Sequence, residues 1–130
     1  MKKRFFILTC ALLCAGLSFA QAKFENWPQM KNFQSILTET FKPAEKGDMS
    51  PIRSRSHELY QNAKLINKMP VPQTVDNEQL RTTLKRLERE TDKLNALVVR
   101  EEQTPTVMKQ FNIVHDTFHE ITGMCTKEDK

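Results

Sequence analysis

The stretch 80-LRTTLKRLERETDKLNALV-98 decides the fold class of this chain. Its core-type positions recur at alternating spacings of four and three residues, at Leu80, Leu84, Leu87, Thr91, Leu94 and Val98. This spacing places the side chains on one helix face as a heptad seam, interrupted by one polar residue. The other positions are rich in charged residues, as a solvated helix surface requires. We therefore expect an amphipathic helix that starts at Asp76, with Gln79 three residues later completing a capping box.

Three further segments show helical periodicity. The first runs from about Trp27 to Phe41, the second from Ser50 to about Lys68, and the third from Thr104 to about Gly123. A proline in the first turn of each is compatible with a helix start. Their apolar stripes are Met30, Phe33, Leu37 and Phe41; Ile52, Leu59, Ala63 and Ile66; and Val107, Phe111, Val114, Phe118, Ile121 and Cys125. The Pro- and Gly-bearing segment 42–49 predicts a loop, as does 70–72. The pattern predicts an all-α, antiparallel up-down-up-down four-helix bundle.

The first 22 residues have the pattern of a secretory signal peptide. Lys2, Lys3 and Arg4 form a positive region, residues 5–17 form an apolar run, and Ala20-Gln21-Ala22 is an A-x-A cleavage site. Ser18-Phe19-Ala20 offers a second site. We expect residues 1–22 to be removed and residues 23–130 to form one domain in the periplasm or outside a bacterium. Because the apolar run is short and no second span follows, we expect no membrane segment after cleavage.

The charge of the remaining 108 residues is close to neutral. The signal holds three of the 20 Lys and Arg and none of the 16 Asp and Glu, which leaves a formal charge of +1. This balance and the absence of a basic stripe argue against a nucleic-acid partner. The sequence also has no Gly-rich phosphate loop, nucleophile elbow or H-E-x-x-H motif, so we expect no enzymatic activity.

Cys125 is the one cysteine that remains after the signal, so an intrachain disulfide is excluded. Three roles stay open for its thiol: pairing with another chain, ligating a metal, or packing as a small buried residue.

His115 and His119 form the one constellation that carries chemistry. They are four residues apart in HDTFHE, so they share a helix face and can chelate one transition metal ion. His115 is expected at the border of the core and His119 at the interface edge. Zinc, copper or nickel is the expected ion, with Cys125 or Glu120 as further ligands. His57 is expected to be exposed and without a role.

The predicted topology also places Met30, His119, the loop at 69–71 and Cys125 at one end of the bundle. Methionine and histidine from opposite helices are a known axial pair for haem iron. The export signal, length and bundle resemble the periplasmic four-helix cytochromes of the c-prime and soluble b types. The c-prime family carries C-x-x-C-H in its last helix; here His119 stands in place of its haem-ligating His.

His115 and Phe118 stand in place of the two cysteines of that motif, so covalent haem attachment is excluded. The soluble b type uses a Met early in the first helix and a His late in the last, and Met30 and His119 match that arrangement. The resemblance implies haem b held without a covalent bond by His119, with Met30 or His115 as second ligand, for electron transfer or haem carriage. The alternatives are a metal-ion binder and a cofactor-free interaction module, dimeric through exposed faces or Cys125.

Overall fold

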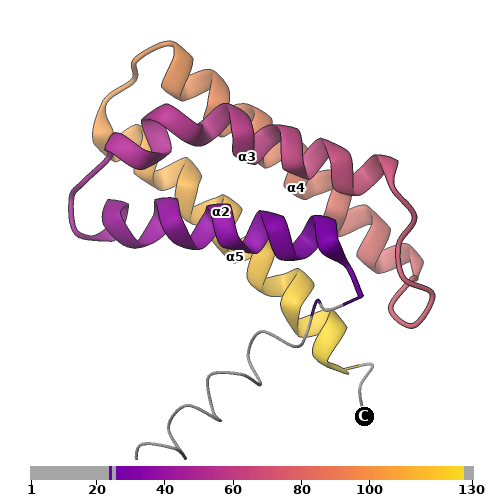
Figure 1. The fold of residues 1–130 in the computed structure, drawn as a ribbon. Helices are drawn as coiled ribbons and strands as arrows, with labels where there is room; N and C mark the ends of the chain where they lie inside the picture. The colour runs from indigo at the N-terminus through magenta and orange to yellow at the C-terminus, as the bar shows by residue number, and fades with distance from the viewer. Residues whose placement is uncertain (1–23, 25, 128–130) are drawn as a thin grey trace, which may run out of the picture.

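The computed structural model describes residue 24 and residues 26–127, which include four helices and no strand. The helices are α2 (Pro28–Glu45), α3 (Ser50–Lys68), α4 (Glu78–Val99) and α5 (Thr104–Lys127). They pack side by side around a shared core (Figure 1), which confirms the all-α class and is consistent with a bundle. None of the described helices is long and apolar enough to cross a membrane. The predicted signal peptide, residues 1–22, lies outside the described residues.

The core contains the apolar stripes that the periodicity predicted. On α4, every residue of the seam from Leu80 to Leu94 is at most 1% exposed, and Val98 is half-buried at the helix end. The predicted stripes of α2, α3 and α5 are buried as well. Thr91 fits this seam because its hydroxyl donates to the carbonyls of Leu87 and Glu88 within its own helix. No buried partner on another helix is needed.

α2 is longer than predicted, because it continues past Phe41 to Glu45 with Pro43 inside its last turn. The prediction of a loop from residue 42 was therefore wrong for the first four residues. Proline removes one backbone donor, but burial of Ala44 against the core holds the turn in place. The helix then ends where Gly47 adopts a φ of 93°, a value that favours glycine.

α5 is also longer than predicted, since Gly123 lies inside the helix and not at its end. The buried side chain of Cys125 attaches the following turn to the core. At the start of α4 the cap is Asn77, whose side chain accepts a hydrogen bond of 2.8 Å from the Leu80 N–H. The predicted cap, Asp76, instead accepts two hydrogen bonds from Arg81.

Polar contacts join the helices that follow one another in sequence. They are Asn32–Asn62 and Glu39–Arg55 between α2 and α3, Ser56–Asn95 and Asn67–Glu88 between α3 and α4, and Glu90–Gln110 and Arg86–Glu120 between α4 and α5. Each helix pair has two such contacts. Of these two, the contact that lies later in the first helix lies earlier in the second.

α2 and α5 meet mainly through aromatic rings. Figure 1 shows α5 running obliquely past α2, and its end extends beyond the other helices. Phe33 packs on Phe118 with ring centroids 5.7 Å apart, and Phe41 packs edge-on against Phe111 at 5.1 Å. Such pairs add about 0.5–1.5 kcal/mol each beyond the burial of area. Because large rings bridge these helices, the seam between them is wider than the others and leaves a groove at its surface.

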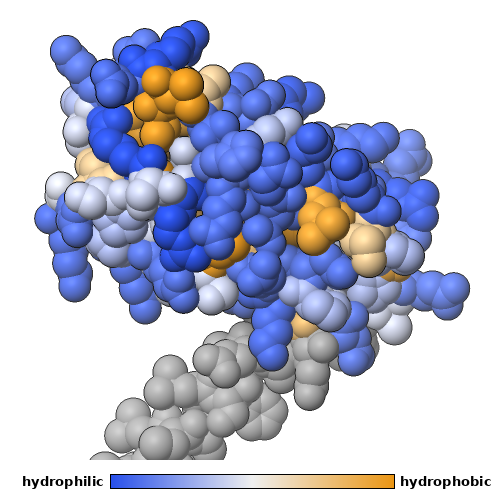
Figure 2. Space-filling model, turned by 45° about the horizontal axis from the view of Figure 1, so that its top comes forward, coloured by the Kyte–Doolittle hydropathy of each residue, from blue (hydrophilic) through white to orange (hydrophobic). Residues whose placement is uncertain are grey.

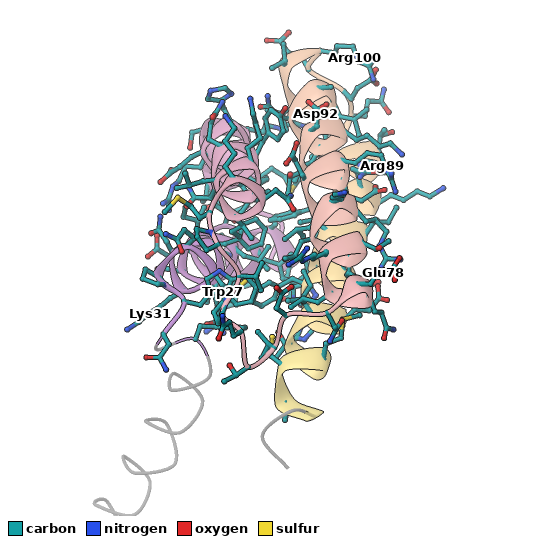
Figure 3. The ribbon with its side chains drawn as sticks, turned by 90° about the vertical axis from the view of Figure 1, so that its right-hand side faces the viewer. Trp27, Lys31, Glu78, Arg89, Asp92 and Arg100 are labelled. Atoms are coloured by element: carbon teal, nitrogen blue, oxygen red, sulfur yellow. The ribbon has the colours of Figure 1, made fainter. Side chains whose placement is uncertain are left out.

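Charged residues dominate the outer side of α4. Figure 3 shows Glu78, Arg89, Asp92 and Arg100 spread along this helix, and all four are exposed. In Figure 2 the visible face is mostly hydrophilic, with hydrophobic residues in separate small patches. The exposed charges of α4 agree with the solvated helix surface predicted from the sequence.

Candidate metal centre

A groove of about 180 Å³ lies between α2 and α5 and contains both histidines of the H-x-x-x-H pair. Its walls are Gln34, Leu37, Thr38, Phe41, Lys42 and Glu45 from α2 and His115, Phe118 and His119 from α5. A second hollow, of about 300 Å³, lies where the end of α3 meets α4. No His, Cys, Asp or Glu lines that second hollow, so it offers no strong metal ligand. The groove is therefore the candidate site.

His115 and His119 direct their Nε2 atoms toward each other at a distance of 3.2 Å. Their rings are 4.4 Å apart between centroids and nearly perpendicular, at 72°. A hydrogen bond at this distance joins an N–H on one ring to a lone pair on the other, and the tautomers decide which ring donates. The one-turn spacing of α5 brings these two nitrogen atoms together without any help from another helix.

Phe41 fixes the ring of His115. The two rings are stacked, with centroids 3.9 Å apart and an interplanar angle of 9°. Burial against this surface lowers the pKa of His115, and the neighbouring His119 lowers it further, whereas Asp116 and Glu45 act in the opposite direction. A lowered pKa keeps the imidazole neutral near pH 7, which is the form that ligates a metal.

The remaining predicted site residues are not among the side chains that line the groove. Met30 is fully buried and Cys125 is 5% exposed, and neither lines the groove. Glu120 forms an ion pair with Arg86 on α4. Within the described part of the chain, no three His, Cys, Asp or Glu side chains come together as a ligand set. His57 is exposed on α3, as predicted, and contacts Gln61.

Comparison of the chain with protein-family models, with curated proteins and with solved structures finds no match in any of the three. The resemblance to four-helix cytochromes therefore stays a prediction.

Sequence reasoning identified the α5 wall of the groove but missed the α2 wall. Polar residues of α2 recur at spacings of four, four and three residues, at Gln34, Thr38, Lys42 and Glu45. They form a polar stripe beside the apolar face of α2. That spacing was a detectable signal, but nothing in it shows that the stripe lies opposite His115.

Proposed function

We propose that this chain is a small exported bundle protein that binds a transition metal ion through His115 and His119. The observation that carries the proposal is the 3.2 Å separation of the two Nε2 atoms. With metal–nitrogen distances of about 2.0–2.1 Å, this separation corresponds to an N–metal–N angle of about 100°. That angle lies between the square-planar and tetrahedral values, so the spacing of the two nitrogen atoms suits one shared ion once the rings turn their lone pairs toward it.

The surroundings of the pair support the proposal. His119 is exposed and admits an ion from solvent, whereas half-buried His115 is held against Phe41. A ring that is already oriented loses less rotamer freedom when it binds, which favours affinity. Because the chain supplies two donors here, the other coordination positions remain open, which suits a protein that takes up and passes on an ion.

The architecture we infer is the antiparallel up-down-up-down bundle in residues 23–130, exported by cleavage of residues 1–22. Support comes from the reversed order of two contacts between α2 and α3. Asn32, early in α2, meets Asn62, late in α3, whereas Glu39, later in α2, meets Arg55, early in α3. The short connections between the helices favour the same topology.

Haem b is the alternative ligand. His119 can present its ring to an iron from the groove, as the cytochrome resemblance implies. However, the groove is smaller than the roughly 300–1,000 Å³ of ordinary cofactor pockets, and Met30 does not reach it. A porphyrin would therefore require α2 and α5 to move apart, which a metal ion does not.

The test is a calorimetric titration of the metal-free purified protein with Zn(II), Cu(II) and Ni(II). We expect saturable binding that a chelator reverses and that His115→Ala or His119→Ala weakens at least tenfold. His57→Ala removes an exposed histidine from α3 and should bind like the parent protein. Equal binding by all four proteins would refute the proposal. A parallel haem titration should show no saturable Soret shift; a one-to-one shift lost in His119→Ala would favour haem b.

A further inference from the structure

The histidine pair forms only part of a coordination sphere. Zinc sites with a structural role use four protein ligands in a tetrahedron. The nearby carboxylates do not supply the missing two. Asp116 and Glu45 do not join the pair as a ligand set, and Glu120 is held by Arg86. Protein donors that complete a tetrahedral ion must therefore come from outside the groove.

The surface around the pair is suited to contact with a second protein. Asn112 is exposed seven residues before His119, and so it lies on the same face of α5. Gln34 and Thr38 on α2 are uncharged as well. The outer side of α4, by contrast, carries charges along its length (Figure 3). Because interface cores are depleted of charge, these uncharged side chains favour the α2–α5 face over the outer side of α4, although Asp116 is exposed on the same side of α5.

Two opposite charges border this face at the last turns of α2. Lys42 and Glu45 both line the groove and are exposed. In a twofold dimer each surface meets its own copy, so Lys42 of one chain can approach Glu45 of the other, and the reverse. The charges on this face therefore complement those on a second copy of it. The face also supplies only two of the four ligands of a tetrahedral ion.

We propose that two copies of this chain share one zinc ion, to which each contributes His115 and His119. This inference rests on the proposed function and names its partner, a second copy of the same chain. Four imidazole nitrogens complete the tetrahedral geometry that Zn(II) prefers. Zinc binding is then coupled to dimerisation, and the dimer dissociates when zinc is removed.

Calorimetry and sedimentation velocity of the purified protein with zinc chloride test the inference together. We expect one zinc ion per two chains and a dimer at half an equivalent of zinc, with a monomer in chelator. A large excess of zinc should return the protein to the monomer, because each chain then holds its own ion. His119→Ala should stay monomeric with zinc, while the matched control His57→Ala should dimerise.

A charge exchange separates contact between the faces from metal binding itself. Lys42→Glu should weaken the zinc-dependent dimer about tenfold, and the double variant Lys42→Glu/Glu45→Lys should restore it. One zinc per chain with a monomer at every zinc concentration would overturn the shared site but leave the proposed function standing. A dimer that persists in chelator would also overturn it. Absence of zinc, copper and nickel binding would overturn both.

Discussion

The ring of Phe41 on α2 lies face to face with the ring of His115 on α5, with centroids 3.9 Å apart. The same phenyl ring packs edge-on against Phe111. Phe41 therefore links the apolar core to the candidate metal centre, since its ring contacts Phe111 in the core and the imidazole of His115 in the groove. Through this contact the packing between α2 and α5 sets the position of a metal-binding nitrogen.

Phe41→Leu should reduce both stability and metal affinity. Loss of the two ring contacts should lower the free energy of unfolding by about 1–2 kcal/mol, measured by urea denaturation. Zinc affinity should also fall several-fold, because His115 loses the surface that orients it. Phe33→Leu is the matched control, because Phe33 contacts Phe118 and not the histidines. The control should lose stability but keep the zinc affinity; equal affinity loss in both variants would contradict an orienting role for Phe41.

The stability of the metal-free protein should fall as the pH drops below about 6.5. Burial and His119 lower the pKa of His115 from its ordinary value of 6.5, so the unfolded chain takes up this proton at a higher pH than the folded one. The cost is absent above the unfolded pKa and grows as the pH falls toward the folded pKa. Asp116 on α5 and Glu45 on α2 oppose the shift and reduce its size.

Thermal melts in chelator across this pH range measure the effect. His115→Gln should give a flatter dependence of the melting temperature on pH than the parent protein. If the parent and His115→Gln curves run parallel, the folded and unfolded pKa values of His115 do not differ.

The features that could be predicted from the sequence are those that depend on the residue spacing within a single helix. The heptad seam around Thr91 and the proximity of His115 to His119 both follow from the helical repeat alone. The α2 wall of the metal centre could not be predicted this way. Glu45 lines the groove with the histidines only because α2 continues through Pro43. The relative position of α2 and α5 depends on how aromatic rings such as Phe41 pack. A single helix pattern does not encode either fact.

Thr91→Val should be neutral or should stabilise the protein by up to about 1 kcal/mol. Thr91 is fully buried, and its hydroxyl bonds only to carbonyls of its own helix. Valine has nearly the same shape, and a helix loses little when such a back-bonded hydroxyl is removed. Urea denaturation measures the change. A loss of more than about 2 kcal/mol would show that the hydroxyl has a structural partner beyond α4.

The two glycines of the described chain should respond in opposite directions to alanine. Gly123 lies inside α5, and an added Cβ would meet no atom within 4 Å, so Gly123→Ala should stabilise the protein by about 0.5–1 kcal/mol. Gly47 also has space for a Cβ, but its φ of 93° is unfavourable for other residues, so Gly47→Ala should destabilise by about 1–2 kcal/mol. Since neither site is crowded, the difference isolates backbone conformation from packing. Urea denaturation of both variants measures it; a loss of stability in Gly123→Ala would mean that α5 does not continue as a helix through residue 123.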